Sequence, residues 1–130
     1  MLETGTARAV IFDMDGVLTD SEPLINASAV AAFGELGLRV EPADFLPFVG
    51  AGENRYLGGV AEKHGYAIDL PGLKRRTYEI YLERVPSELA PFPGACELVR
   101  ACRSAGLRIA VASSAEDRKS TRLNSSHRIR

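Results

Sequence analysis

The sequence predicts an α/β fold in which a parallel sheet carries a small all-helical insertion after its first strand. Two short apolar segments, 9–12 and 107–112, have the composition of buried strands, and each is followed directly by polar residues. Residues 23–90, which lie between them, show the helical spacing of apolar residues. A further helix is expected at 93–105, and a strand–helix–strand connection of this kind makes a right-handed crossover between parallel strands.

The first strand ends in a pair of carboxylates. Ala9 to Phe12 is apolar, so we expect a strand that is buried on both faces, with Asp13 where the strand runs out. Asp13 and Asp15 are two positions apart, which places both side chains on one side of an extended backbone. Gly16 then lets the chain turn away with backbone angles that a Cβ atom disfavours. Ligands of open α/β sheets bind at this carboxyl edge.

Two carboxylates this close repel one another. At roughly 4 Å and an effective dielectric constant near 20, the repulsion costs about 4 kcal/mol, so a cation or a shared proton must offset it. Mg²⁺ suits such an oxygen-rich site and also accepts phosphate oxygens. The alternative is structural, because Asp and Gly are common turn residues and the short pattern D-x-D-G by itself is more typical of a turn.

Apolar spacing predicts four helices in the insertion. The first begins at Glu22, has Ser21 as its N-cap and ends at Gly37. The other three are expected at residues 42–49, 53–64 and 73–85. Each pattern gathers its apolar residues on one face, which is typical of helices that pack together. Residues expected on these faces include Ala29, Phe33, Leu36, Leu57, Val60, Ala61, Tyr78 and Tyr81.

The chain then returns to the sheet. Residues 86–93 contain three prolines and are expected to form a linker. The helix at 93–105 is expected to turn its apolar positions inward, namely Cys96, Leu98, Val99 and Cys102. The second strand, which we also expect to be buried, ends at Ser113 and Ser114. A Ser-Ser turn alone is commonplace, so it gains meaning only beside the carboxylates of the first strand.

The complete string A-V-I-F-D-M-D-G-V-L-T-D-S-E, from Ala9 to Glu22, resembles the opening motif of the haloacid dehalogenase superfamily. The resemblance implies the N-terminal part of a Rossmann-like core. It also implies that Asp13 is a nucleophile that forms an aspartyl-phosphate and binds Mg²⁺. Asp15 would be the general acid and base, with its backbone carbonyl on the metal. An acid at this second position favours phosphoryl transfer over carbon–halogen cleavage.

The second strand and the insertion extend the resemblance. An apolar strand closed by Ser is similar to the second motif of the superfamily, which implies that the Ser113 hydroxyl and the Ser114 amide, together with Gly16, bind phosphate. The helical insertion is similar to the cap of the branch that includes β-phosphoglucomutase and phosphoglycolate phosphatase, a cap that excludes water and selects the substrate. Arg55, in the cap loop, is a candidate contact for a substrate anion. Segments such as D-F-L-P-F-V-G-A-G-E and V-A-S-S-A are most similar to the hydrolase domain of a larger plant protein.

The expected activity is therefore Mg²⁺-dependent hydrolysis of a small phosphomonoester. A phosphosugar mutase of the same fold is the first alternative. Two departures count against it, because Ile25 stands where many such enzymes carry His, and Arg55 lies two residues later than the Arg that contacts their second phosphate. The second alternative is a non-catalytic regulatory module that keeps the fold and binds Mg²⁺ or phosphate without turnover.

Composition limits the partners. The net charge of −1 over 130 residues gives no basis for binding nucleic acid, and no apolar run is long enough to span a membrane. Cys96 and Cys102 would lie about 9 Å apart along one helix, too far for a disulfide, which fits a reducing compartment. We expect a protein of the cytoplasm, or of the chloroplast stroma by its plant resemblance, that acts on a small phosphorylated metabolite. The oligomeric state stays open.

The expected domains are a core of residues 1–22 and 91–117, a cap of residues 23–90 and a basic tail of residues 118–130. The tail contains five basic residues and no acidic residue, and it is either a solvated tail or a non-native read-through, because K-S-T-R-L-N-S-S-H resembles a translated sequencing adapter. The resemblance further implies a Lys and one or two metal-binding acids later in the chain. None lies at that spacing here, so we expect the 130 residues alone to fold marginally and to turn over little substrate.

Overall fold

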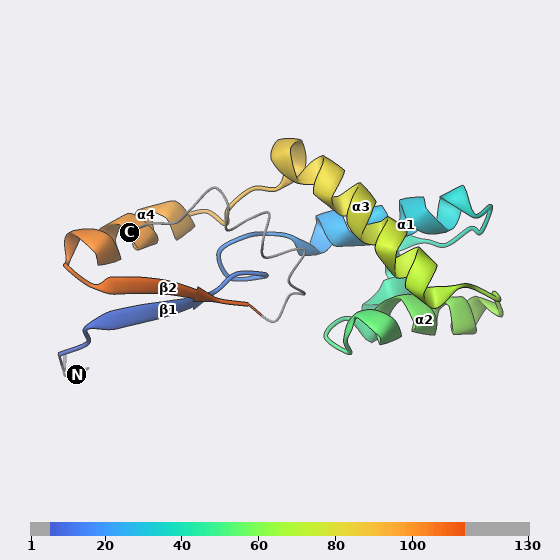
Figure 1. Cartoon of the computed structure of the whole chain (residues 1–130), viewed down its shortest axis with the longest axis horizontal. Coiled ribbons are helices and arrows are strands. Elements are labelled where there is room, and N and C mark those ends of the chain that lie inside the picture. Colours follow the sequence, from blue (N-terminus) through green and yellow to red (C-terminus); the bar gives the residue numbers. More distant parts are fainter. Residues whose placement is uncertain (1–5, 114–130) are drawn as a thin grey trace. The chain divides into compact units, whose positions relative to one another are not determined.

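The computed structural model describes residues 6–113, and these residues form two compact units (Figure 1). One unit contains the chain up to Ser21 and from Leu89 onward, whereas the other spans Glu22–Glu88. The first unit holds the sheet, and the second is entirely helical and is inserted between the two strands of the first. The expected α/β fold with an inserted helical segment is confirmed.

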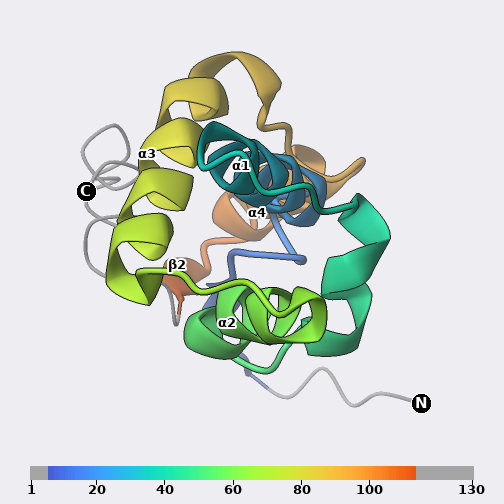
Figure 2. The same ribbon diagram turned by 90° about the vertical axis from the view of Figure 1, so that its right-hand side faces the viewer.

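The second unit packs its helices around one apolar core (Figure 2). Helix α1 (Glu22–Glu35) lies beside α3 (Leu70–Glu88), and α2 (Glu53–His64) contacts both α3 and the 3₁₀ helix η1 (Pro42–Phe48). The bounds of α2 match the sequence expectation at both ends, and Gly65 closes this helix in the left-handed conformation.

Three aromatic rings run through this core. The rings of Phe33 and Phe45 meet edge to face with centroids 6.0 Å apart, and the rings of Phe45 and Tyr56 lie 4.9 Å apart. Such pairs contribute about 0.5–1.5 kcal/mol each beyond the area they bury. Burial also raises the pKa of the Tyr56 hydroxyl. The rings therefore join α1, η1 and α2 into one body.

The surface of the helical unit is tied by ion pairs between α1 and α3. The Arg76 guanidinium donates to both carboxylate oxygens of Glu35, at 2.7 Å and 2.9 Å. This hydrogen bond lowers the pKa of the Glu35 carboxyl. A two-point contact of this kind fixes the geometry between two helices more firmly than a single-point contact does.

Helix α3 ends later than the sequence predicts. The expected linker begins at residue 86, but Pro86 lies inside the last turn of α3, which continues to Glu88. The Arg84 guanidinium donates to both Glu88 oxygens, at 2.9 Å and 2.8 Å, and this pair stabilises the final turn that Pro86 weakens.

Leu36 was also expected on the buried face, but it lies beyond the end of α1 and is 56% exposed.

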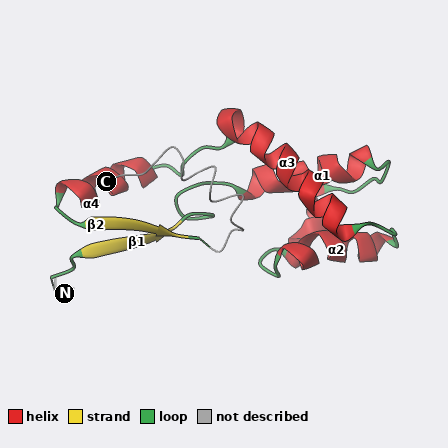
Figure 3. Ribbon diagram, viewed as in Figure 1, coloured by secondary structure: helices red, strands yellow, loops and turns green. Residues whose placement is uncertain are grey.

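The first unit contains a two-stranded parallel sheet in its described part (Figure 3). Strand β1 (Ala9–Asp13) pairs in register with β2 (Arg108–Ala112), so that Ala9 lies opposite Arg108 and Asp13 opposite Ala112. Helix α4 (Ala95–Ser104) precedes β2 and contacts it. The parallel pairing confirms the crossover that the strand–helix–strand pattern predicts.

The expectation that both strands are buried on both faces is wrong for the described residues. Phe12 is 7% exposed, but Ile11 is 70% exposed and Val111 is 52% exposed. Successive side chains of a strand point to opposite faces, and α4 is the one helix of this unit in residues 6–113, so it covers at most one face. On α4 itself, Leu98 was expected to point inward but is 53% exposed, and Cys96 is exposed as well.

Candidate active site

Asp13 and Ser113 lie at the same end of the parallel sheet. Asp13 is the last residue of β1 and is paired with Ala112, the last residue of β2, so Ser113 follows the direct neighbour of Asp13. Neighbouring strands lie about 4.8 Å apart, so the backbones at the ends of β1 and β2 lie close together. The Asp13 Oδ1 atom accepts the N–H of Met14 at 2.8 Å, and the side chain is exposed. A carboxylate and a hydroxyl therefore share the carboxyl edge, where ligands of such sheets bind.

The loop after Asp13 is folded around one carbonyl group. The Met14 carbonyl oxygen accepts the N–H groups of Val17, Leu18 and Thr19 at 3.3, 2.9 and 3.1 Å. Gly16 adopts a φ of +73°, and its N–H donates to the Thr19 carbonyl at 2.9 Å. A Cβ atom at this position would meet no other atom within 4 Å, so the backbone conformation, not space, requires glycine.

Asp15 contacts a buried hydroxyl that sequence reasoning did not assign to the site. The Ser21 Oγ atom donates to Asp15 Oδ1 at 2.8 Å, and Ser21 is only 4% exposed. The sequence predicts Ser21 as a helix N-cap, and no periodicity links it to Asp15 through the intervening loop. The only sequence signal is a hydroxyl residue a few positions after a pair of acids.

The two segments that connect the units are tied together beside this loop. Asp20 donates its N–H to the Ala90 carbonyl at 3.1 Å, and Phe92 donates to the Leu18 carbonyl at 3.0 Å. Thr19 and Pro91 form an isolated bridge between these hydrogen bonds. The outgoing and returning chains are therefore held side by side within the first unit.

Arg55 belongs to the helical unit and already has partners there. Its Nη1 atom lies 2.8 Å from Glu62 Oε2, and its guanidinium stands 5.1 Å from the centre of the Phe48 ring. The Arg55–Glu62 pair is more than half exposed on both sides, and pairs of this type contribute about 0–1 kcal/mol. The loop before Arg55 contains Gly50 and Gly52, both with positive φ.

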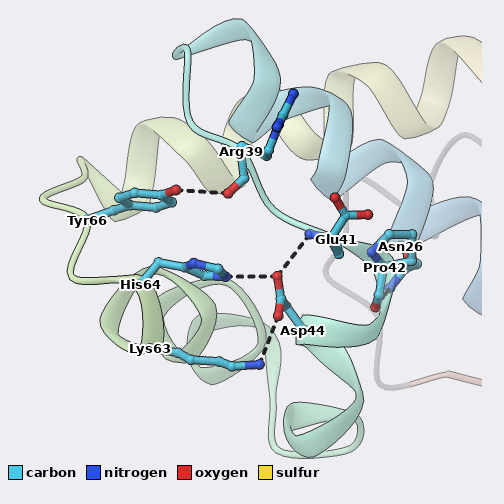
Figure 4. A network of polar contacts seen from close by, with 8 residues as sticks. All are labelled: Asn26, Arg39, Glu41, Pro42, Asp44, Lys63, His64 and Tyr66. Atoms are coloured by element: carbon cyan, nitrogen blue, oxygen red, sulfur yellow. Dashed lines mark hydrogen bonds and ion pairs between the residues drawn. The ribbon is translucent and has the colours of Figure 1, made fainter.

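A polar network fixes the helix η1 that leads into this loop (Figure 4). The Asp44 carboxylate accepts the Glu41 N–H at 2.9 Å and contacts Lys63 Nζ and His64 Nε2, each at 2.8 Å. These hydrogen bonds hold the pKa of Asp44 well below its usual range, and the bond from the Glu41 N–H has the largest effect. The His64 ring also stacks on Tyr66 at 5.2 Å. His64 thus joins α2 to η1.

Some expected features lie outside the described residues. Ser114, predicted to donate its amide to phosphate, is one of them, and the tail from residue 118 onward is another. Within residues 6–113, no three side chains of His, Cys, Asp or Glu are grouped closely enough to hold a metal ion by themselves. No helix in that range combines the length and apolar composition needed to cross a membrane.

Fold and site together define an α/β protein with acids at the carboxyl end of a parallel strand and a hydroxyl on the next strand. A family match described as haloacid dehalogenase-like hydrolase covers residues 7–125. The chain belongs to this family of hydrolases, as the D-M-D-G-V-L-T-D-S motif predicts.

Individual relatives agree with this assignment. The chain is 49% identical over 115 residues to Protein SUPPRESSOR OF QUENCHING 1, chloroplastic, from Arabidopsis thaliana, covering 86% of the chain and 11% of that protein. It is 30% identical over 106 residues to the phosphoglycolate phosphatase of Caulobacter vibrioides, covering 78% of the chain and 45% of that protein. A crystal structure named as a β-phosphoglucomutase from Thermotoga maritima is 28% identical with a TM-score of 0.72, covering 88% of the chain and 53% of that structure.

These coverages show that the chain spans about a tenth of the plant relative and about half of the two bacterial relatives. The similarity to a plant protein and to the branch with phosphoglycolate phosphatase and β-phosphoglucomutase was expected from the sequence and is confirmed.

Proposed function

We propose that this chain is the nucleophile-bearing part of a Mg²⁺-dependent phosphatase that hydrolyses a small phosphomonoester through an aspartyl-phosphate on Asp13. The observation that carries the proposal is the register of β1 and β2, which pairs Asp13 with Ala112 and so sets it next to Ser113. Phosphoryl transfer depends mainly on positioning and on donors that stabilise the phosphate oxygens, and this sheet end offers a nucleophile and a donor together.

Each residue has a distinct role in the proposed reaction. The Asp13 carboxylate attacks phosphorus, and the alcohol leaves as an acyl phosphate forms. Asp15 gives a proton to the leaving oxygen and later takes one from the water that hydrolyses the intermediate. Ser113 and Ser114 bind phosphate oxygens. The N–H of Gly16 is already donated to the Thr19 carbonyl, so Gly16 contributes the sharp turn of the loop and not a direct contact with phosphate.

The residues present fit Mg²⁺, which hydrolases of this superfamily generally use. The exposed Asp13 carboxylate and the Asp15 backbone carbonyl offer only oxygen donors. Mg²⁺ is commonly held by one or two carboxylates and fills its other positions with water and phosphate oxygens, which agrees with the small number of acids here. When bound, the ion neutralises charge on the phosphoryl group.

The helical unit, Glu22–Glu88, is proposed to act as the substrate-selecting cap. Arg55 would release Glu62 and bind a substrate anion in its place. Breaking the Arg55–Glu62 ion pair costs little free energy, because the pair is exposed and weak. The substrate would be a small phosphorylated metabolite. The chloroplast name of the Arabidopsis relative supports the chloroplast over the cytoplasm.

A phosphosugar mutase is the second candidate, and the similarity to the Thermotoga structure is the observation that favours it. Ile25 and the position of Arg55 count against it. A mutase would need a bisphosphate to start each cycle, whereas a phosphatase would not.

Acyl phosphate formation tests the proposal without requiring turnover, which we propose is slow for these 130 residues alone. The chain is incubated with acetyl phosphate and Mg²⁺, and the intact mass is measured for a gain of one phosphoryl group. Asp13→Asn should abolish the gain. Asp15→Asn is the matched control: it should still gain the group, because acetate leaves without protonation, and should lose it more slowly. Equal labelling of Asp13→Asn and the unaltered chain would contradict the proposal.

A further inference from the structure

The first unit buries little apolar surface of its own. Among the described residues, all but two of the buried hydrophobic side chains lie in the helical unit, and the two in the first unit are Phe12 and Ala95. The described residues of the first unit, 6–21 and 89–113, are close to the size of about 40 residues below which domains usually need disulfides, a metal or association. Both cysteines are free. Association is therefore the stabilising device to look for.

One face of the two-stranded sheet is open to solvent. Side chains alternate between the faces along a strand, and paired residues of parallel neighbours share a face. Ile11 is paired with Ala110, whereas the buried Phe12 is paired with Val111 on the opposite face. Every residue on the face of Ile11, which we call the open face, is exposed, and four of the six are apolar: Ala9, Ile11, Asp13, Arg108, Ala110 and Ala112.

The two charged residues of the open face lie at opposite corners. Asp13 ends β1 beside Ala112, and Arg108 begins β2 beside Ala9. Within residues 6–113, neither side chain forms an ion pair with another residue. A strand rises about 3.3 Å per residue, so the two corners are separated by about 13 Å along the strands, which exceeds the screening length of about 8 Å in physiological salt. The two charges therefore do not compensate one another within one chain.

We propose that the open face binds the open face of a second copy of this chain, with the strands of the two copies antiparallel. A two-fold axis that crosses the strands sets Ile11 against its own counterpart. It also brings Asp13 of each copy to the same end as Arg108 of the other, so two complementary pairs form. Parallel strands would gather Asp13 with Asp13 and Arg108 with Arg108, so charge selects the antiparallel arrangement. This inference does not rest on the proposed function.

Charge also favours a second copy over the other occupant that the chain itself offers. Residues 118–130 contain five basic residues and no acidic residue, so this segment would bring more positive charge to Arg108. A second copy presents both signs, each at the corner where it is complementary. A face of two five-residue strands is small, so we expect a reversible dimer of the weak, transient class.

Sedimentation velocity of the full chain, over about 5–500 μM, measures this association. The unaltered chain should shift from monomer to dimer as its concentration rises. Ile11→Asn and Arg108→Asp should each weaken dimerisation at least about tenfold. Leu46→Asn is the matched control, because it replaces an apolar side chain that is 69% exposed in the helical unit, and it should leave the dissociation constant unchanged.

Exchanging the two charges tests the antiparallel arrangement. The double variant Asp13→Arg/Arg108→Asp restores both complementary pairs with reversed signs, so it should dimerise within about threefold of the unaltered chain, unlike Arg108→Asp alone. Circular dichroism checks that each variant folds, and Ala110→Glu replaces Ile11→Asn if the latter does not.

Three results would overturn the proposal. The first is a chain that stays monomeric over the whole concentration range. In that case, a lower urea midpoint for Ile11→Asn would assign the open face to a segment of the same chain. The second is a dimer that Ile11→Asn, or Ala110→Glu in its place, leaves equally stable. The third is a double variant that associates as weakly as Arg108→Asp alone.

Discussion

Two adjacent glycines of α2 are predicted to respond in opposite ways to alanine. A Cβ atom at Gly58 would lie 3.6 Å from the nearest atom, Cδ2 of Leu70, which is an ordinary van der Waals contact. A Cβ atom at Gly59 would lie 2.5, 2.6 and 2.8 Å from three atoms of the Phe48 ring. Real Cβ atoms do not approach so closely, so the ring must move when Gly59 is replaced.

The magnitudes follow from this difference. Either replacement gains about 0.8–1 kcal/mol of helix propensity. Gly58→Ala keeps this gain and should stabilise the chain by about 0.5–1 kcal/mol. Gly59→Ala adds an overpacking cost of about 1–3 kcal/mol, because Phe48 leaves its place beside α2 and its contact with Arg55. The two variants should therefore differ by about 1–3 kcal/mol.

Urea unfolding followed by far-ultraviolet circular dichroism measures this difference directly. Gly58→Ala should raise the urea concentration at the unfolding midpoint. The midpoint of Gly59→Ala should lie below that of Gly58→Ala, with the same dependence of the unfolding free energy on urea in both variants. Equal midpoints for the two variants would show that Phe48 does not pack on Gly59, and the packing of η1 against α2 would have to be revised.

Two further predictions concern the same helical unit. Phe45→Ala should lower the free energy of unfolding by about 3–5 kcal/mol, since the ring is fully buried, whereas Leu46→Ala, at a position 69% exposed, should change it by less than about 0.5 kcal/mol in the same urea titration. The pKa of Asp44 is lowered by folding, so its contribution is complete above the unfolded value of about 4 and should be lost as the pH falls below it. In thermal melts, the melting temperature of Asp44→Asn should fall less over that acid range than the melting temperature of the unaltered chain. An equal fall in both would mean that Asp44 does not cause the acid destabilisation.

Local patterns predicted the helical unit well. The ends of α2 carry their own signals, with Gly52 before the helix and Gly65 after it, and the structure follows both. The error at Pro86 arose because proline marks a helix end by its missing N–H, while the compensating Arg84–Glu88 pair depends on side chains that form no apolar pattern.

Burial of the sheet was harder to predict, because it depends on what covers the strands. Ile11 is apolar and strand-forming, yet it is 70% exposed in the described part of the fold. Strand composition indicates a side chain suited to burial, but it does not supply the covering element.

At the candidate site, the sequence predicted residues that a strand end brings together, and it missed those joined through a loop. The approach of Asp13 and Ser113 follows from parallel pairing alone. The Ser21–Asp15 bond and the contact of Asp44 with His64 depend on the three-dimensional path of the chain, so no spacing rule indicates them.

The identity of the phosphorylated residue tests the account most directly. After incubation with acetyl phosphate and Mg²⁺, the chain is reduced with borohydride, which converts an aspartyl-phosphate to homoserine, and the peptides are sequenced by mass spectrometry. We predict homoserine at position 13 and at no other aspartate. Reduction at Asp15 or at Asp20 in place of Asp13, or none at position 13, would contradict the account.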